Sequence, residues 1–366
     1  MFCNNLRLKS CDVMIRMSFL SWNIMYGEDM LCIVPPHLLR EIINRGDPAM
    51  KKWAINTITL SEQTRMQRQV FVTNTIMSVS EQKQRRIYDA KNKSTLPGKL
   101  VRTEGDPSVD DPAVNEAYDG AGWTYDLYKD VYGRNSVDDK GMTLDSTVHY
   151  SEKYDNAFWN GNQMVYGDGD GKIFNRFTIA IDVIGHELTH GVTQYTAKLE
   201  YQDQSGALNE HISDVFGSIV KQYSLKQNTK QADWLIGYDL FMPKIHGIAL
   251  RSMKAPGTAY DDPLIGKDPQ PGTMQDYNDT SEDNGGVHIN SGIPNRAFYL
   301  IATDIGGYSW DKAGKIWYKT LDLLNANSTF EDMASCTFEA AGILFGSAEQ
   351  ESVRKGWDGV GITVKK

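Results

Sequence analysis

Residues 179–195 read IAIDVIGHELTHGVTQY, and this stretch guides the interpretation of the whole chain. Its apolar residues recur at helical spacing with no intervening proline, which predicts a helix over residues 180–195. Side chains four residues apart share one face of a helix, so His186 and His190 can bind the same metal ion. Glu187 lies beside them and can accept a proton from a water molecule that the metal activates. The pattern therefore favours a catalytic zinc site over a chance pair of helical histidines.

A catalytic zinc ion needs three protein ligands and one open position, so a third ligand must come from elsewhere. The metzincin pattern requires a histidine at position 196, where this chain has Thr196. The segment GALNEHISD (206–214) offers Glu210, far enough along the chain for a second helix to turn back beside the first. Asp214 shares the helical face of Glu210 and can accept the second N–H of a ligand histidine. The alternative interpretation of this segment is an exposed acidic helix face.

The composition is typical of globular proteins, because 40% of the 366 residues are hydrophobic and 23% are charged. This length predicts two domains and an additional smaller segment. The net charge of −9 argues against nucleic acid or an anionic membrane as a partner, and no apolar run is long enough for a transmembrane helix. Of the four cysteines, only Cys336 lies outside the amino-terminal region, so the main body is expected to lack an internal disulfide.

Four zones follow one another along the chain. Residues 1–29 show neither periodicity nor a signal-peptide cleavage site, and we expect them to be unstructured or a spurious extension before a start at Met30. Residues 30–80 are helix-prone, residues 81–179 carry the turn residues and short alternating runs of a β-rich lobe, and residues 180–366 are helix-rich. In this last zone helical spacing predicts helices over residues 180–195, 206–223, 292–303, 312–324 and 329–345.

Further segments extend the pattern well beyond one motif. They are NAFWNG (156–161), MVYGDGDG (164–171), GALNE (206–210), LRSM (250–253) and NGGVHINSG (284–292). Together with HELTH they resemble, in matching order over residues 87–364, the thermolysin-like neutral metalloproteases, also called gluzincins. The resemblance implies a metalloendopeptidase with an α+β fold of two lobes. It places the zinc helix between a β-rich N-terminal lobe and an α-helical C-terminal lobe, and a small helical propeptide in front of both.

The resemblance also implies a role for each residue of the metal site. His186, His190 and Glu210 correspond to the zinc ligands, and Asp214 corresponds to the carboxylate that orients His186. Zinc lowers the pKa of a bound water to about 7. Glu187 corresponds to the general base that takes a proton from this water and later protonates the leaving amine.

Three more residues resemble the part of the family's site that stabilises the reacting carbonyl oxygen. His288 and Tyr201 are similar to the two hydrogen-bond donors, and Asp283 resembles the carboxylate that orients His288. The alternative is that His288 and Tyr201 are ordinary core or surface residues. The NGGVHINSG context favours the catalytic interpretation of His288, whereas that of Tyr201 depends on its position shortly before Glu210.

Substrate-binding residues follow from the same resemblance. Asn156 and the backbone of Ala157 resemble the edge that binds an extended peptide by strand addition, and Arg251 resembles the residue that binds a peptide carbonyl after the scissile bond. The pocket for the side chain after that bond is expected to be lined by Phe174, Phe177, Val183, Ile236 and Leu250. Because all five are apolar, we expect cleavage on the amino-terminal side of Leu, Phe, Ile or Val. Phe177 is bulkier than the leucine usual there, which predicts a shallower pocket.

The segment CIVPPHLLR (32–40) resembles the short propeptide of the protealysin-like subgroup. This implies an inhibitory propeptide that docks in the cleft, on the side after the scissile bond, through four residues: Pro35, Pro36, Leu38 and Leu39. Prolines suit an inhibitory segment because they fix an extended backbone and lack the N–H of an ordinary leaving amide. Cys32 as a zinc-binding thiolate is the alternative. Self-cleavage is expected within residues 66–86.

One departure from the family concerns calcium. The positions that match its double calcium site read Asp182, Lys221, Asp233, Leu235, Tyr238 and Asp239. Calcium needs six to eight oxygen ligands, so we expect this site to be absent. We expect the Lys221 ammonium to take the place of the cation among Asp182, Asp233 and Asp239.

The expected partners are protein or peptide substrates and the chain's own propeptide, with a dedicated protein inhibitor as an additional candidate. We expect a monomer that is secreted without a clear signal peptide, with a cytoplasmic location as the alternative. Two other functions are considered. An inactive binding protein is opposed by the intact Glu187, His288 and Tyr201. A zinc hydrolase of another amide or of one specific target is distinguished by cleavage-site profiling.

Overall fold

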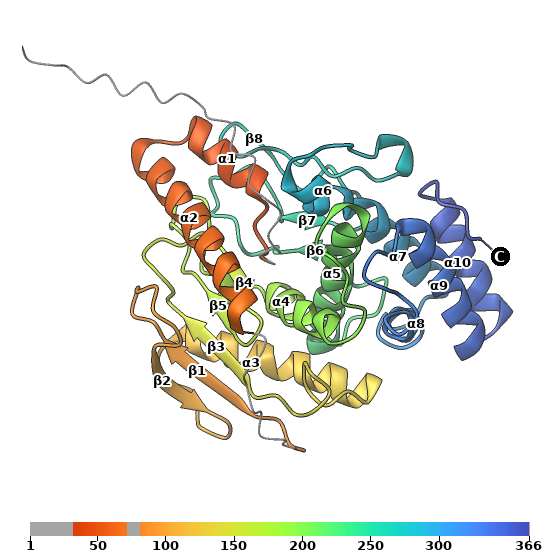
Figure 1. Ribbon diagram of the computed structural model, residues 1–366, viewed down its shortest axis with the longest axis horizontal. Coiled ribbons are helices and arrows are strands. Elements are labelled where there is room, and N and C mark those ends of the chain that lie inside the picture. Colours follow the sequence, from red (N-terminus) through yellow and green to blue (C-terminus); the bar gives the residue numbers. More distant parts are fainter. Residues whose placement is uncertain (1–31, 72–80, 366) are drawn as a thin grey trace, which may run out of the picture.

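The computed structural model describes residues 32–71 and 81–365 and has the expected two-lobed α+β architecture. Helices α4 (Ile181–Gln194) and α5 (Asp203–Leu225) lie between a mixed sheet and the C-terminal helices (Figure 1). The expectations for residues 1–29 and for a start at Met30 lie outside the described residues, as do residues 72–80 of the segment expected to be cleaved.

The N-terminal lobe is built on a five-stranded sheet of order β2-β1-β3-β5-β4. Its strands are β1 (Arg85–Asp89), β2 (Lys99–Thr103), β3 (Leu144–Val148), β4 (Ala157–Trp159) and β5 (Met164–Tyr166). Strand β3 pairs in parallel with β1 and β5, whereas the outer strands β2 and β4 are antiparallel to their neighbours. Because β4 is an edge strand, the backbone groups on its outer side can pair with another segment.

The N-terminal lobe also contains helix α3 (Pro112–Asp126), which the sequence analysis did not predict. The sequence contains the capping residue, the proline and the apolar spacing of this helix, but the turn residues around them obscured the pattern. The Asp111 side chain caps the helix by accepting the N–H of Ala113, and a proline occupies the first helical position. Ala113, Ala117 and Ala121 recur on one buried face.

The C-terminal lobe is helical, as expected. After α5 it contains α6 (Asp283–Asn290), α7 (Gly292–Ile305), α8 (Lys312–Thr320), α9 (Phe330–Leu344) and α10 (Ser347–Asp358). The five predicted helices are confirmed with small shifts, although α8 ends four residues before the predicted boundary. Helix α10 was not predicted, because only Val353, Gly356 and Trp357 of its residues are buried. The remaining short elements are η1 (Leu127–Val131), η2 (Phe177–Ile179), β6 (Leu235–Ile236), β7 (Arg251–Ser252), β8 (Asp261–Asp262), β9 (Gly266–Lys267) and η3 (Met274–Asp276).

Glycines allow α4 and α5 to pack closely. A Cβ atom added to Gly217 would lie 2.4 Å from the carbonyl oxygen of Asp182 and 3.1 Å from the backbone nitrogen of His186. A Cβ atom on Gly185 would lie 3.1 Å from the Cα of Gly217. Any larger residue at these positions would push the helices apart, so the glycines help to hold His186 against α5.

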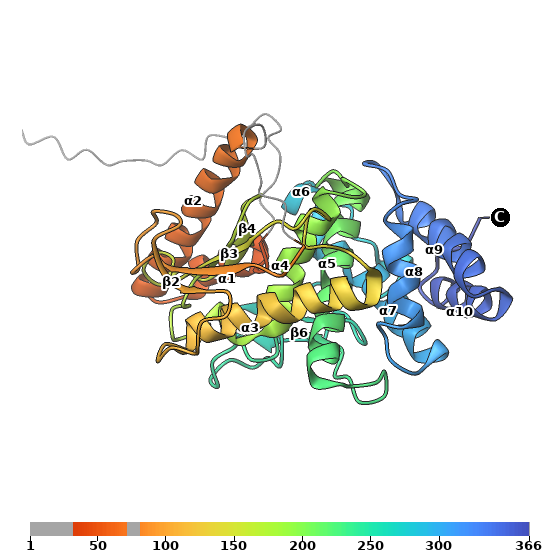
Figure 2. The same cartoon turned by 90° about the horizontal axis from the view of Figure 1, so that it is seen from below.

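Two amino-terminal helices, α1 (Pro36–Arg45) and α2 (Pro48–Phe71), pack against both lobes. Helix α1 contacts the C-terminal part of the chain, where Arg40 pairs with Glu282. Helix α2 contacts the N-terminal lobe, where the hydroxyl of Ser61 lies 2.9 Å from that of Tyr154. Figure 2 shows that the far end of α2 projects from the body of the molecule.

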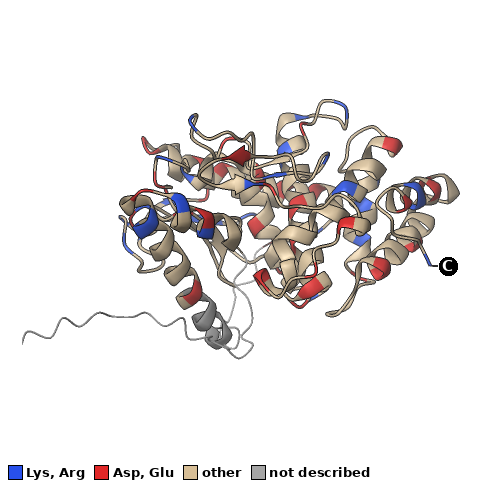
Figure 3. Cartoon of the chain, turned by 90° about the horizontal axis from the view of Figure 1, so that it is seen from above, with Lys and Arg blue, Asp and Glu red and all other residues tan. Residues whose placement is uncertain are grey.

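Within the described residues, none of the helices combines the length and the apolar character needed to span a bilayer. Figure 3 shows acidic and basic residues interspersed over the helices of both lobes.

Candidate active site

Helices α4 and α5 bring two imidazoles and a carboxylate together at the junction of the lobes. The Nε2 atoms of His186 and His190 lie 2.9 Å apart. Glu210 Oε2 lies 3.5 Å from Nε2 of His186, and Glu210 Oε1 lies 3.4 Å from Nε2 of His190. All three side chains are buried. In the part of the chain that the structure describes, they form the one group of three or more His, Cys, Asp or Glu residues arranged to hold a metal ion.

The orientation of these groups fits a cation. His186 Nδ1 donates to Asp214 Oδ1 at 2.8 Å, and His190 Nδ1 donates to Asn209 Oδ1 at 2.9 Å. Each ring therefore has its lone pair on Nε2, and burial keeps His186 neutral by lowering its pKa to about 4. Glu210 Oε2 is buried without a hydrogen-bond partner. Converging lone pairs and a carboxylate are stable together only with a cation between them, and two nitrogens plus one oxygen are typical ligands of catalytic zinc.

Glu187 lies on α4 between the two histidines and is completely buried. Its Oε2 atom accepts the backbone N–H of Trp159 at 3.0 Å. This bond links the carboxylate to edge strand β4, so Glu187 is held where the metal group meets the free edge of the sheet.

His288, Asp283 and Tyr201 form a second polar group beside the metal group. His288 Nδ1 lies 2.7 Å from Asp283 Oδ1, and the hydroxyl of Tyr201 lies 3.1 Å from His288 Nε2. Tyr201 also donates a hydrogen bond to Glu210. Burial alone would lower the pKa of His288, but the charges of Asp283 and Glu210 outweigh burial and raise it to about 9. The ring is therefore protonated at neutral pH and can donate from Nε2.

The NGG part of the NGGVHINSG motif has a conformational role. Asn284, Gly285 and Gly286 adopt φ angles of 51°, 80° and 75° at the start of α6. A Cβ atom on Gly285 would lie 2.0 Å from the Asp203 side chain, so both the angle and the close approach require glycine. This turn sets the position from which His288 reaches Tyr201.

Arg251 has a structural contact that the sequence did not predict. It donates two hydrogen bonds of 2.8 Å to Asp214, and Asn295 donates a third of the same length. Asp214 thus joins Arg251 to His186 within a fully buried network. Burial would raise the pKa of Asp214, but the charge of Arg251 outweighs it and holds the pKa well below its usual range. No spacing rule could reveal this pair, because the two residues come from α5 and the distant strand β7.

An extended segment of the chain itself lies along the free edge of β4. Cys32 forms an antiparallel bridge to this strand, and the N–H of Ile33 donates to the carbonyl of Ala157 at 3.3 Å. The N–H of Val34 donates to Asn156 Oδ1 at 2.9 Å. The edge expected to bind an extended peptide is therefore covered by residues 32–34.

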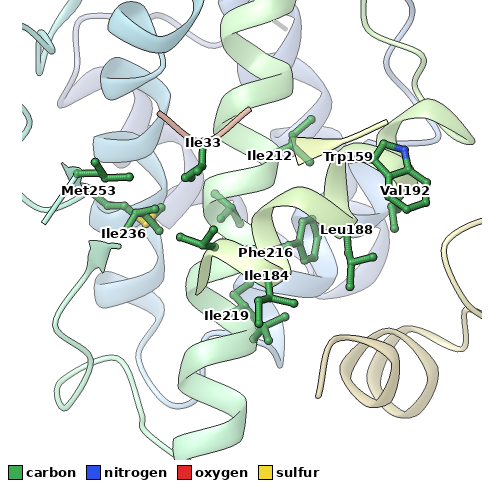
Figure 4. Close-up of a cluster of buried hydrophobic side chains, with 14 of the residues drawn as sticks. Ile33, Trp159, Ile184, Leu188, Val192, Ile212, Phe216, Ile219, Ile236 and Met253 are labelled. Carbon is green, nitrogen blue, oxygen red and sulfur yellow. The ribbon is translucent and has the colours of Figure 1, made fainter. Parts of the chain in front are cut away.

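Side chains on the other side of the cleft hold the same segment. Arg251 Nη1 donates to the carbonyl of Ile33 at 3.0 Å, and His288 Nε2 lies 3.0 Å from the carbonyl oxygen of Cys32. The Ile33 side chain is completely buried, and Figure 4 draws it in one apolar cluster with Ile212, Ile236 and Met253. The five residues expected to line the pocket are at most 2% exposed and belong to the same main core, which extends through both lobes: Phe174, Phe177, Val183, Ile236 and Leu250.

The contacts with Arg251 and Asn156 come from residues earlier in the chain than the four propeptide residues named from the sequence. Leu38 and Leu39 are buried, and Pro35 and Pro36 precede them at the start of α1. However, Ile33 and Val34, which the sequence did not single out, make the hydrogen bonds to Arg251 and Asn156. The sequence did not single out Ile33 and Val34, because an extended segment has no periodic signal that shows which residue fills a pocket.

The alternative of a zinc-binding Cys32 is not supported by its surroundings. Its side chain packs in an aromatic cluster with Tyr150, Tyr154 and Phe158. The metal-holding group found in the described residues does not include it. It is the backbone carbonyl of Cys32, rather than its thiol, that contacts the polar groups of the site.

A buried His–His–Glu group, an adjacent glutamate and a peptide-binding strand edge define a metal-dependent peptide hydrolase. Comparison with known sequences leads to the same class. The family described as "Thermolysin metallopeptidase, catalytic domain" matches residues 54–194, and "Thermolysin metallopeptidase, alpha-helical domain" matches residues 197–362. The chain belongs to the thermolysin family of metallopeptidases.

Individual relatives support this membership. The chain is 51% identical over 344 residues to an extracellular metalloprotease of Pectobacterium carotovorum, which covers 93% of this chain and 99% of that protein. It is 45% identical to the thermolysin of Alicyclobacillus acidocaldarius, over 75% of this chain and 50% of that protein. Among solved structures, the precursor of protealysin from Serratia proteamaculans matches with a TM-score of 0.84 and 52% identity, over 91% of this chain and all of that chain.

Proposed function

We propose that this chain is the self-inhibited precursor of a zinc endopeptidase that cleaves on the amino-terminal side of bulky hydrophobic residues. One observation carries the proposal. His186, His190 and Glu210 converge beside a strand edge on which residues 32–34 lie as an extended peptide would.

The chain's own residues have distinct tasks in this reaction. Zinc held by the two imidazoles and Glu210 supplies a Lewis acid that lowers the pKa of water and polarises a carbonyl. Glu187 accepts a proton from the attacking water and delivers it to the leaving amine nitrogen. His288 and Tyr201 donate hydrogen bonds to the carbonyl oxygen as negative charge develops on it.

Other residues position the reacting groups. Asp214 holds His186 in the tautomer that leaves Nε2 free to bind metal, and Asp283 orients His288. Asn156, the Ala157 backbone and Arg251 hold the peptide main chain. These groups now hold residues 32–34, which supports their assignment to substrate binding.

Specificity is expected to follow from the apolar cluster that contains Ile33. Profiling of a peptide library should show cleavage before Leu, Ile, Val and Phe at least about tenfold faster than cleavage before Asp or Lys, because an unpaired charge is costly in an apolar pocket. Phe177→Leu should enlarge the pocket. The ratio of the cleavage rate before Phe to the cleavage rate before Val should therefore be higher for this variant than for the parent. Equal rates before apolar and charged residues would contradict the proposal.

The propeptide, residues 30–80, inhibits by covering the cleft, and the lobes of the mature enzyme comprise residues 81–179 and 180–366. The support for inhibition is steric, because a substrate cannot bind to Asn156 and Arg251 while Val34 and Ile33 occupy them. Release requires a cut within about residues 66–86. The likeness to the precursor of protealysin supports this arrangement.

Inhibition is expected to weaken in acid because of His37. Its Nε2 lies 3.0 Å from the hydroxyl of Tyr260, and its Nδ1 is buried without a hydrogen-bond partner. Burial lowers the pKa of His37 from 6.5 to about 4. The charged groups that face it are Asp283, His288, Arg40 and Arg251. Docking is therefore fully stable above pH 6.5 and weakens as the pH falls toward 4, because the undocked histidine binds a proton more readily.

The measurement is the rate of peptide hydrolysis by the intact precursor as a function of pH. The fraction of precursor molecules whose cleft is not covered by the propeptide should increase by up to about 100-fold as the pH falls from 6.5 to 4. His37→Gln should flatten this dependence, while Lys52→Gln, on an exposed position of α2, should leave it unchanged. An identical pH profile for His37→Gln and the parent would contradict this prediction.

We also propose that no calcium binds at the family's double site. Lys221 Nζ lies 3.1 Å from Asp182 and 2.8 Å from Asp233, and its third contact is the carbonyl of Leu235 at 3.2 Å. Asp239, expected as a partner, makes no ion pair with Lys221, so that part of the expectation is wrong. Added calcium should leave the unfolding midpoint unchanged, whereas zinc removal should lower it. A rise of the midpoint with calcium would refute this proposal.

Location and partners complete the proposal. We infer that the protein is secreted, with cytoplasmic retention as the alternative, because the Pectobacterium relative is named as extracellular. Its partners are protein or peptide substrates and its own propeptide. A dedicated protein inhibitor is a further candidate, and the active form is proposed to be a monomer.

A further inference from the structure

We propose that the precursor hydrolyses its own Cys32–Ile33 peptide bond, and that this cut occurs within one molecule. The proposal rests on the endopeptidase function above. The Cys32–Ile33 bond precedes α1. A separate cut, after α2, is needed to separate the propeptide from the two lobes.

Residues 32–34 are held in the direction and register of a substrate. The carbonyl before the bond, on Cys32, lies 3.0 Å from the donor atom of His288. The nitrogen of the bond, on Ile33, donates to Ala157, and the next carbonyl accepts from Arg251 at 3.0 Å. The carbonyl of Cys32 contacts His288, whereas that of Ile33 contacts Arg251, so the Cys32–Ile33 bond is the one that faces the catalytic groups.

The bond also lies beside the metal group. His288 Nε2, which contacts the Cys32 carbonyl, is 3.6 Å from Glu210 Oε1 and 3.1 Å from the hydroxyl of Tyr201. His288, one of the two proposed donors to the reacting carbonyl oxygen, thus contacts the Cys32 carbonyl, and Tyr201 lies next to His288. Hydrogen bonds to this oxygen strengthen as it gains negative charge, which favours hydrolysis of this particular bond.

Two features keep the register from slipping. The Ile33 side chain is completely buried in the apolar cluster, so moving the segment by one residue would place Cys32 or Val34 in that position. Pro35 follows and has no N–H, so it cannot continue the hydrogen bonding along β4. The anchored helices α1 and α2 hold the segment at an effective concentration that no separate substrate can match.

The reaction is a simple hydrolysis. The oxygen of one water molecule bonds to the carbonyl carbon of Cys32, and the bond from that carbon to the nitrogen of Ile33 breaks. Glu187 transfers a proton from the water to the departing nitrogen. The products are a carboxylate on Cys32 and an ammonium group on Ile33, and no other reactant is needed.

The product remains partly inhibited. Residues 33–71 stay attached through Arg40–Glu282, His37–Tyr260 and Ser61–Tyr154, whereas the contact between Cys32 and His288 is lost. The cut therefore removes the upstream segment and loosens the cleft without removing the propeptide.

The test uses the full-length precursor, purified without metal and then supplied with zinc. Intact-mass spectrometry should show a new chain that begins at Ile33, with a rate constant that is independent of protein concentration. Ile33→Asp should slow this cut at least about tenfold, because its side chain no longer fits the apolar cluster. Ile55→Asp, the same substitution at a half-exposed position of α2, should cut at the parent's rate.

Three results would overturn the inference. The bond could stay intact while the same sample hydrolyses an added peptide, which leaves the proposed function standing. The rate could rise in proportion to protein concentration, which shows cleavage between molecules. If the zinc-loaded parent cleaves neither this bond nor an added peptide, the proposed function fails together with the inference.

Discussion

Glu187→Gln is expected to reduce kcat/KM for peptide hydrolysis by about 100- to 10,000-fold, the usual contribution of a general base. Glutamine has the shape of glutamate and can still accept the N–H of Trp159 through its carbonyl oxygen, so the fold should be retained. It cannot accept a proton from water at neutral pH. The loss should therefore appear in kcat, with little change in KM.

The comparison is sharpest when the docking of residues 32–34 in the cleft is weakened. For this purpose the Glu187→Gln protein and its parent both carry Ile33→Asp. Both are expected to bind one zinc ion per chain and to have equal unfolding midpoints. Glu351→Gln, an exposed glutamate of α10 that pairs with Arg354, is the matched control and should keep full activity. Activity of the Glu187→Gln protein within tenfold of its parent would show that another group acts as the base.

Arg251→Leu is expected to destabilise the protein by about 3–5 kcal/mol, because it leaves the buried charge of Asp214 without its main partner. Asp214 also orients His186, so zinc affinity should fall as well. The carbonyl of Ile33 loses a donor at the same time, which weakens docking of the propeptide. The measurements are urea unfolding of the zinc-loaded chain and competition with a zinc chelator.

Arg354→Leu provides the control for the second prediction. Arg354 pairs with Glu351 and Asp358 on the exposed face of α10, where solvent screens the charges. Its loss should leave both the unfolding midpoint and zinc affinity nearly unchanged. If the two leucine variants unfolded at the same urea concentration, the buried network would not have the importance assigned to it.

The sequence predicted the centre of the site well, for a physical reason. The spacing of His186 and His190 determines a shared helical face once a helix forms, and the same holds for Glu210 and Asp214 on the next helix. The pairing of these two helices followed from the family resemblance. The structure then added Gly185 and Gly217, which allow the close approach that brings the ligands together.

Contacts between distant extended segments could not be predicted in this way. The pairing of Arg251 with Asp214, and the placement of Ile33 over the apolar cluster, depend on how short irregular strands are positioned by the whole fold. Helix α3 was missed for a different reason. Its alanine-based face is weakly apolar and lies among turn residues, so the local pattern resembled that of the strands around it.

The central claim is that His186, His190 and Glu210 bind one zinc ion, and a crystal structure of active protein measured at the zinc absorption edge tests it most directly. We predict a single anomalous peak within bonding distance of two Nε2 atoms and the Glu210 carboxylate, and about one zinc per chain by elemental analysis. Full activity with no metal in the protein, or an anomalous peak bound by other residues, would contradict the account.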